Sequence, residues 1–322
     1  MLLSRFAESL YWAGRYLERA EATARLIKEH TELLLDLPRA AGVGWSPLLA
    51  VTGCTDEFLG RHTGPEEEDV IDFLTADPKN RGSVLASLGQ ARVNLLASRV
   101  VLPRPSWEVV NNLHGWAVVS ADQAIDRRTR LGWMDGVITQ CELFAGSLAN
   151  SMNYDEAYGF LQIGRHLERA DMTIRVLDVQ AGILVGQPEE RDPVGASYRD
   201  VTWMSVLRSL SAQQMFFRTV GGGVSGPAAL RFLLQDDRFP RSVEFCLSAA
   251  ARGLGRLPRA APSLASCGEA QARLRALSIT DQVTPHELNE LVDELETDIG
   301  EVHQTLARTY FPEVVIPVEA SA

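Results

Sequence analysis

The segment that decides the fold is YWAGRYLERAEATARLI, residues 11–27, which returns as LQIGRHLERADMTIRVL at residues 161–177. Eight of the seventeen aligned positions are identical, at a constant offset of 150 residues. Helices often share apolar spacing by chance, but chance does not place glycine, arginine and glutamate at the same helical positions twice. The segment is therefore an internal repeat, and whatever its motif does, the chain does twice.

The repeat extends beyond this segment. A second block, Phe73, Leu74, Asp77, Ser83, Val84 and Leu88, returns as Phe232, Leu233, Asp236, Ser242, Val243 and Leu247. Between the blocks, Trp45 and Trp203 each head a short helical pattern. The preserved order predicts one ancestral half that was doubled, because solenoid units are much shorter, at roughly 20 to 50 residues. We expect one domain, 1–322, with repeats at about 1–150 and 151–312, pseudo-twofold symmetry and a loose tail, 313–322.

Helical periodicity of 3.6 residues recurs almost everywhere, and no stretch alternates apolar and polar residues as a strand would. The pattern predicts an all-α fold, a helical bundle built from the two halves. Proline and glycine mark where helices stop. The helices that we expect are 4–38, 81–101, 107–128 and 133–152 in the first half, and 153–188, 241–257 and 286–311 in the second.

The composition bounds the function. With 46% hydrophobic and 23% charged residues in 322, the chain can bury a large core, and its net charge of −11 disfavours nucleic acid as a partner. No apolar run approaches the roughly 20 residues that a membrane span needs, and the start lacks a signal-peptide pattern. Four scattered cysteines favour neither a zinc site nor a disulfide framework. We expect a cytoplasmic protein with no membrane association.

The repeated segment carries one polar stripe in each copy. On a helix, Gly14, Glu18, Glu21 and Arg25 lie within about 60 degrees of one another. A mid-helix glycine costs roughly 1 kcal/mol relative to alanine, so its presence in both copies indicates close approach of another backbone or a ligand. The candidate binding or interface residues are Gly14, Arg15, Glu18, Arg19, Glu21, Arg25, Gly164, Arg165, Glu168, Arg169, Asp171 and Arg175.

Pairing within each helix is also expected. Glu21 with Arg25, and Asp171 with Arg175, have the i,i+4 spacing of helical ion pairs. Glu18 and Glu168 can be reached from one turn earlier, by Arg15 and Arg165. If the two long helices pack together, four carboxylates and up to six arginines converge.

Such a cluster has four interpretations. It can lock two helices in register as a structural ion-pair network, or recognise a partner or a polar small molecule. A metal site is disfavoured because neither copy contains the ExxH motif of ferritin-like di-iron proteins, and the arginines would compete with a dication. Acid–base catalysis by Glu18 and Glu168 requires a raised carboxyl pKa, which neighbouring arginines oppose. His166 is better interpreted as a packing or hydrogen-bonding residue than as a base.

Three segments together resemble a known family. SRFAESLYWAGRYLERAEATARLI (4–27) and FLQIGRHLERADMTIRVL (160–177) are similar to the two diagnostic helices of the bacterial Alpha-E proteins, and SWEVVNNLHGW (106–116) is similar to a third block. Ser9 departs from the pattern, in which asparagine is common, and this affects one polar helix contact. The family's glutamates map onto Glu18 and Glu168, with Glu21 and Asp171 beside them.

The resemblance implies a context. Alpha-E proteins are associated with, and sometimes fused to, circularly permuted ATP-grasp proteins, and with transglutaminase-like and proteasome-like peptidases, in what look like amide or peptide ligase systems. It implies a non-catalytic accessory subunit that binds the ligase or presents its substrate, with no cofactor of its own and with ATP and Mg²⁺ in the partner. The alternatives are an enzyme that acts on a peptide or amide through Glu18 and Glu168, and a carboxylate-rich metal protein.

Overall fold

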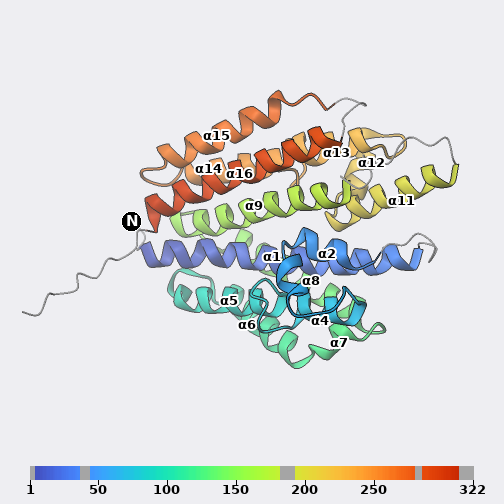
Figure 1. The fold of residues 1–322 in the computed structure, drawn as a ribbon. Coiled ribbons are helices and arrows are strands. Elements are labelled where there is room, and N and C mark those ends of the chain that lie inside the picture. Colours follow the sequence, from blue (N-terminus) through green and yellow to red (C-terminus); the bar gives the residue numbers. More distant parts are fainter. Residues whose placement is uncertain (1–3, 37–43, 182–192, 280–284, 312–322) are drawn as a thin grey trace, which may run out of the picture.

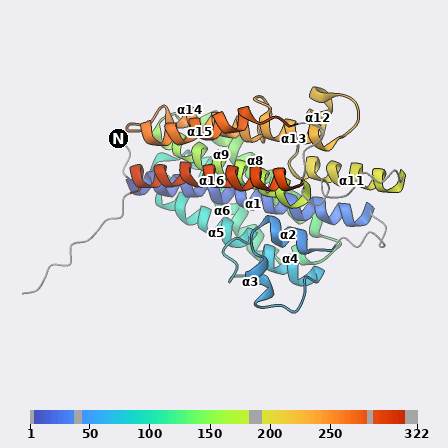
Figure 2. The same ribbon diagram turned by 45° about the horizontal axis from the view of Figure 1, so that its top comes forward.

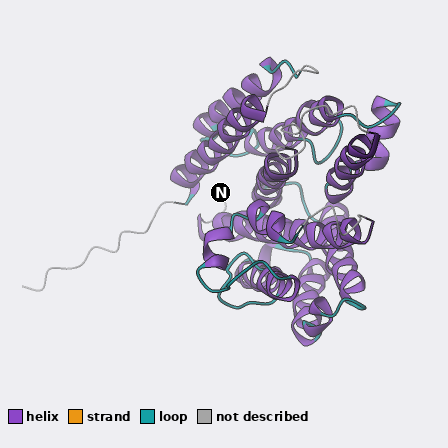
Figure 3. Ribbon diagram, turned by 45° about the vertical axis from the view of Figure 1, so that its right-hand side comes forward, coloured by secondary structure: helices purple, strands orange, loops and turns teal. Residues whose placement is uncertain are grey.

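The computed structural model describes residues 4–36, 44–181, 193–279 and 285–311 (Figure 1). Across these ranges every regular element is a helix and no strand occurs, so the predicted all-α fold is confirmed (Figure 3). The predicted tail, 313–322, and the predicted end of the second long helix near residue 188 lie outside the described residues.

The helices of the first half begin with one long element. They are α1 (Ser4–Asp36), α2 (Ser46–Val51), α3 (Thr55–Leu59), α4 (Glu67–Thr75), α5 (Val84–Ala97), η2 (Arg99–Val101), α6 (Arg104–Val119), α7 (Asp122–Ile125) and α8 (Arg130–Ser151). Those of the second half are α9 (Glu156–Val176), η3 (Leu177–Ala181, a π-helical turn), α11 (Pro193–Ser209), α12 (Gln213–Val220), α13 (Gly226–Gln235), α14 (Val243–Leu254), α15 (Ala261–Ala276) and α16 (Pro285–Tyr310).

Two four-helix groups meet along α1 and α9 (Figures 1 and 2). In the first, α1 packs on α5 and α8, α5 packs on α6, and α6 packs on α8. In the second, α9 packs on α14 and α16, α14 packs on α15, and α15 packs on α16. The central helices α1 and α9 run in the same direction and form the largest helix–helix contact of the fold.

Two glycines set the distance between α1 and α9. A Cβ atom on Gly14 would overlap the carbonyl oxygen of Leu161, and one on Gly164 would overlap the carbonyl oxygen of Tyr11. Only glycine allows backbones to approach this closely. The close approach inferred from the repeated glycine is confirmed, and its partner is the other helix.

Local polar contacts explain where some helices begin and where others are interrupted. α5 begins at Val84 because the Ser83 hydroxyl accepts the N–H of Ala86, so the helix is shorter than the predicted 81–101. The predicted helix 107–128 is divided into α6 and α7. At the break, the Ser120 hydroxyl donates to the Trp116 carbonyl and accepts from Trp133 Nε1, which offers the backbone an alternative to continued helix.

One predicted helix start is wrong. Trp45 directly precedes α2, as expected, but Trp203 lies inside α11 and does not head it. That helix begins ten residues earlier at Pro193, a residue type that suits the first turn of a helix. In the part of the chain that the structure describes, no helix combines the length and apolar character that crossing a bilayer requires.

Candidate functional site

The twelve residues singled out from sequence converge where α1 crosses α9. Glu18 of α1 is 2% exposed and accepts four hydrogen bonds from three arginines. Arg169 donates to both of its oxygens, from Nε and Nη2, each at 2.7 Å. Arg165 Nε lies 3.1 Å from Oε2, and Arg241 Nη1 lies 2.8 Å from Oε1.

Glu168 of α9 is the reciprocal carboxylate, and it is 1% exposed. Arg15 Nε and Arg19 Nε, both on α1, each lie 2.5 Å from one of its oxygens. A carboxylate has about four lone-pair sites. Glu168 accepts two arginine hydrogen bonds where Glu18 accepts four, so the two halves of the cluster are unequal.

The second carboxylate of each stripe pairs within its own helix, as predicted. Arg25 Nη2 lies 2.8 Å from Glu21 Oε1, and Arg175 Nε lies 3.2 Å from Asp171 Oδ2. Glu21 also accepts a hydrogen bond from Arg241. Here again the α1 side has one guanidinium more than the α9 side.

The expected pairing of Glu18 with Arg15, and of Glu168 with Arg165, is wrong. Arg15 donates to Glu168 and Arg165 donates to Glu18, so both guanidinium groups cross between the helices. The physical reason is the close glycine crossing, which brings the carboxylate of the opposite helix within reach. The convergence of four carboxylates with six arginines is confirmed.

Sequence reasoning missed Arg241, the seventh arginine. It directly precedes Ser242, whose hydroxyl caps α14 by accepting the N–H of Phe245. The Arg241 carbonyl accepts the hydroxyl of Thr173, which fixes this arginine against α9 and aims its side chain at Glu18 and Glu21. The sequence did contain a signal for it. Ser83 and Ser242 align, and the residue before Ser242 is Arg241, whereas the residue before Ser83 is Gly82.

Burial and charge act oppositely on the two central carboxylates. Burial alone would raise the pKa of Glu18, but Arg169, Arg241 and Arg165 outweigh it and hold that pKa well below its usual range. Burial also acts to raise the pKa of Glu168, and there Arg15 and Arg19 together outweigh it, so the pKa is lowered. Both glutamates are therefore ionised at neutral pH.

Asp171 differs from them. Burial raises its pKa, and the attraction of Arg175 offsets this only in part, while the neighbouring charge of Glu168 raises the pKa further. Asp171 thus has too little positive charge around it. A buried carboxyl with a raised pKa beside a cavity marks a candidate functional site.

A cavity of about 240 Å³ lies on the Asp171 side of the cluster. Arg19 and Arg175, which line it, have side chains that are 29% and 33% exposed, so the cavity is reached from solvent. The turn between α2 and α3 contributes Thr52 and Cys54 to its wall. Its other lining residues are Thr23, Gly82, Glu168, Asp171 and Met172.

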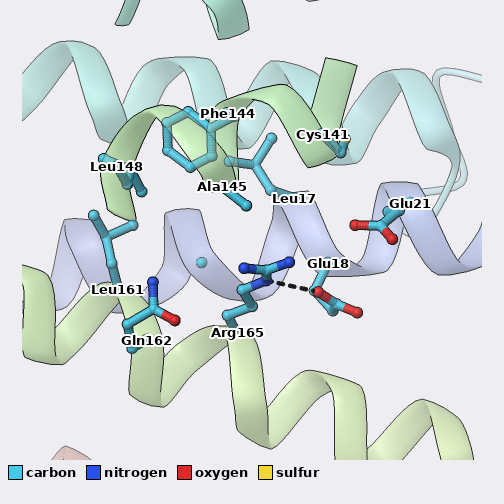
Figure 4. Close-up of a pocket in the computed structure, with 11 residues that line it drawn as sticks. Leu17, Glu18, Glu21, Cys141, Phe144, Ala145, Leu148, Leu161, Gln162 and Arg165 are labelled. Carbon is cyan, nitrogen blue, oxygen red and sulfur yellow. Dashed lines mark hydrogen bonds and ion pairs between the residues drawn. The ribbon is translucent and has the colours of Figure 1, made fainter. Parts of the chain in front are cut away.

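On the Glu18 side, in contrast, the space is nearly filled. Figure 4 shows the pocket there, with Arg165 directed at Glu18 and with Cys141, Phe144 and Leu148 on its far wall. Its volume is about 20 Å³, which is room for about one water molecule. Because Arg241 also occupies the space between Glu18 and Glu21, we call the Glu18 side of the cluster the closed side and the Asp171 side the open side.

His166 stands in the segment 161–177 where Tyr16 stands in the similar segment 11–27. Burial, followed by the charge of Arg169, lowers the pKa of His166 to about 3, so the ring is neutral. Its Nδ1 atom is buried without a hydrogen-bond partner. A ring with this pKa is a poor base near neutral pH, and of the two roles expected for it, packing and hydrogen bonding, the contacts of the described residues favour packing.

A metal ion was among the possible ligands of the cluster. Within the four described ranges, no three His, Cys, Asp or Glu side chains are placed so that they could hold a metal ion. The acidic pair Glu168 and Asp171 stands beside Arg19 and Arg175.

The sequence matches the Alpha-E family, described as a predicted alpha-helical domain with a conserved ER motif, over residues 2–311. The chain belongs to the Alpha-E family. Glu18–Arg19 and Glu168–Arg169 are Glu-Arg dipeptides of the kind that this description names. In this Alpha-E chain, the glutamate of each dipeptide binds the arginine of the other.

Curated relatives extend beyond the length of this chain. Uncharacterized proteins of Mycobacterium tuberculosis, strains H37Rv and CDC 1551, and of Mycobacterium bovis are each 25% identical to it over 92% of its length. The match covers 34% of each relative, so the chain spans about a third of the length of the curated relatives that it matches. No solved structure gives a significant match.

Proposed function

We propose that this Alpha-E protein is a non-catalytic accessory subunit of an ATP-dependent amide or peptide ligase system. In this proposal it binds a circularly permuted ATP-grasp protein and helps to present that enzyme's substrate. The observation that carries the proposal is the charge state of the glutamates at the family's signature positions. Both are buried, ionised and bound by arginines, as in a recognition or locking element.

Acid–base catalysis by Glu18 and Glu168 is disfavoured on the same ground. An acid–base pair needs one carboxyl that keeps its proton near neutral pH, which requires a raised pKa. Burial would raise both pKa values, but the surrounding arginines outweigh it and lower them. Neither glutamate can therefore supply a proton, and we assign the bond-forming chemistry to the partner.

The length of the mycobacterial relatives supports a role beside other domains. Their remaining two thirds lie outside the match to this chain. A domain that is one part of a longer polypeptide in its relatives acts next to the other parts, and interfaces between domains resemble those between separate proteins. We infer that this chain binds the kind of domain that adjoins it in its relatives.

The cofactors and further partners follow from the same proposal. ATP and Mg²⁺ bind the ATP-grasp partner, this chain holds no cofactor, and a transglutaminase-like peptidase acts in the same system. We place the complex in the cytoplasm, where ATP is available.

Within this proposal the two sides of the cluster have different tasks. The closed side, around Glu18, locks α1 against α9. The open side, with its cavity beside Glu168 and Asp171, anchors the substrate that is presented to the ligase. Arg19 and Arg175 stand at the cavity and are the half-buried residues past which a ligand would enter.

We also infer that the two halves arose by duplication. Ser83 and Ser242 cap α5 and α14 through the same hydrogen bond, to the N–H three residues later. The helices of each half pack in the same order. Reciprocal contacts at Glu18 and Glu168 fit a pseudo-twofold axis between α1 and α9.

The proposal is tested by affinity purification of the tagged chain from its native cell, followed by mass spectrometry. The expected result is an ATP-grasp protein in comparable amount, which is absent when an unrelated protein carries the tag. Recovery of this chain alone at high yield, with the ATP-grasp protein left unbound, would overturn the subunit proposal.

A second measurement separates binding from substrate presentation. The ATP-dependent turnover of the partner is compared with the unaltered chain, with Asp171→Asn and with Gly115→Arg. Asp171→Asn alters the open side, whereas Gly115 is exposed on α6 with no neighbouring atoms within 4 Å of a Cβ placed there. Loss of turnover with Asp171→Asn alone supports the anchor, and equal turnover with all three contradicts it.

A further inference from the structure

The open side of the cluster lacks one group that the closed side has. On the closed side, the Arg241 guanidinium bridges Glu18 and Glu21. The equivalent carboxylates on α9 are Glu168 and Asp171, and no side chain bridges them in the described part of the chain. The residue equivalent to Arg241 is Gly82, because each directly precedes the serine that caps its helix.

The cavity lies where this missing side chain would be. Its wall contains Gly82, Glu168 and Asp171, together with Thr23, the counterpart of the threonine that holds the Arg241 carbonyl. The two carboxylates, the threonine and the capping serine around Arg241 thus have counterparts here, with Asp171 in the place of Glu21, whereas Gly82 stands in the place of Arg241. The cavity volume of about 240 Å³ admits a group the size of a side chain and is below the range typical of drug-sized ligands.

The two carboxylates keep unused capacity to accept hydrogen bonds. Glu168 accepts two from arginines, against the four that its counterpart Glu18 accepts. Among the described residues Asp171 pairs only with Arg175, and its raised pKa reflects burial with too little positive charge nearby. A cation placed between these two side chains would supply what Arg241 supplies on the other side.

We propose that this cavity binds a guanidinium group from outside the chain, such as an arginine side chain of a peptide, which bridges Glu168 and Asp171 as Arg241 bridges Glu18 and Glu21. The proposal gives a substrate class to the anchor described above and rests on the proposed function for its biological role. The binding itself is a property of the isolated chain.

An anionic ligand fits the same cavity less well. The arginines at its wall, Arg19 and Arg175, already direct their Nε atoms at Glu168 and Asp171. An anion would also meet those two carboxylates at close range. We favour a cationic ligand over an anionic one because the equivalent space on the closed side is filled by the guanidinium of Arg241.

The test measures binding to the full chain by isothermal titration calorimetry. The probe is N-acetyl-arginine amide, whose only charge is its guanidinium, and the control is N-acetyl-citrulline amide, which has nearly the same shape and no charge. We expect one site, with the arginine compound bound at least about tenfold more tightly than the citrulline compound. Equal affinities, or saturable binding of inorganic phosphate in place of the arginine compound, would overturn the assignment.

Two variants test whether the probe binds in this cavity. Gly82→Arg supplies the missing side chain, at a position whose backbone is not in the left-handed region and where a Cβ meets only the side-chain oxygen of Asn80. It should weaken probe binding at least about tenfold, whereas Gly115→Arg, with the same added charge on an exposed part of α6, should not. Unchanged binding in Gly82→Arg would contradict the proposal.

If Gly82→Arg does not fold, Asp171→Asn serves the same purpose, with the same expected loss and the same contradicting result. The outcomes also distinguish this inference from the proposed function. If the probe binds but affinity purification recovers no ATP-grasp protein, the guanidinium site is supported and the subunit role is refuted. If affinity purification recovers the ATP-grasp protein but the probe does not bind, the subunit role is supported and the guanidinium site is refuted.

Discussion

A buried carboxylate is stable in a helix interface only when its charge is compensated. Glu18 on α1 and Asp171 on α9 lie in one cluster and differ in how many guanidinium groups of the described residues reach them. Glu18 is bound by three, and Asp171 by one. Removing the charge of Glu18 should therefore lower the stability of the protein, whereas removing the charge of Asp171 should leave it unchanged or raise it.

We expect Glu18→Gln to lower the free energy of unfolding by about 3–5 kcal/mol, because removal of one partner leaves buried charges uncompensated. Urea-induced unfolding measures this. Glu108→Gln, in the exposed pair with Arg104, is the matched control and should change stability by no more than about 0.5 kcal/mol. A loss at Glu18 as small as the loss at Glu108 would show that the cluster does not lock the helices.

Asp171→Asn should be neutral or stabilising at pH 7 in the absence of ligand, within about 1 kcal/mol of the unaltered chain. The folded state holds a proton on Asp171 more tightly than the unfolded state does, so ionisation above that raised pKa costs stability. The difference between variant and unaltered chain should disappear as the pH falls below 3.8, the ordinary aspartate value. A large loss at pH 7 would contradict this account.

His166 makes stability depend on pH. The unfolded state binds a proton near the ordinary value of 6.5, whereas the folded state, where burial lowers the pKa to about 3, does not. The contribution of the neutral ring is fully present above pH 6.5 and is lost as the pH falls towards 3. Between pH 6 and 4 the unaltered chain should lose about 1.4 kcal/mol per pH unit more than His166→Phe. Parallel urea-denaturation curves for the two proteins would contradict this prediction.

Among the elements, the pair α1 and α9 positions the whole cluster. Their glycines remove the side chains that would separate the helices, and the arginines consequently reach across to the opposite glutamates. The glycines and the charge pairs therefore depend on one another. A change that separates the helices should weaken both.

Gly164→Ala should destabilise the protein by about 1–3 kcal/mol or more, because the added Cβ overlaps the Tyr11 backbone, which cannot rotate away. The matched control is Gly115→Ala, on the exposed surface of α6, which should raise stability by up to about 1 kcal/mol through helix propensity. Thermal unfolding of both variants measures the contrast. A stabilised Gly164→Ala protein would mean that the helices do not cross as closely as described.

The whole molecule depends on contacts between its two halves. All three arginines bound to Glu18 lie after residue 153, and both arginines bound to Glu168 lie before it. Each half alone would bury a glutamate without the arginines that the other half supplies to it. Neither half is therefore electrostatically complete.

We expect residues 1–152 and 153–322, expressed as separate chains, to form a one-to-one complex that is folded, while each half alone is unfolded or aggregated. Size-exclusion chromatography and circular dichroism measure this. The break falls in the short connection between α8 and α9, so it removes no helix. Two separately stable halves that do not associate would contradict the prediction.

Local sequence patterns determined the all-α fold, the two long helices and the pairs Glu21–Arg25 and Asp171–Arg175, because all of these depend on helical periodicity alone. The repeat also predicted a close crossing at Gly14 and Gly164. Tertiary structure alone decided that arginines cross between α1 and α9, that Arg241 reaches Glu18 from 223 residues away, and that a cavity remains beside Gly82. These features depend on where the segment before α14 places Arg241 and where the segment before α5 places Gly82, and local periodicity does not encode such contacts between distant segments.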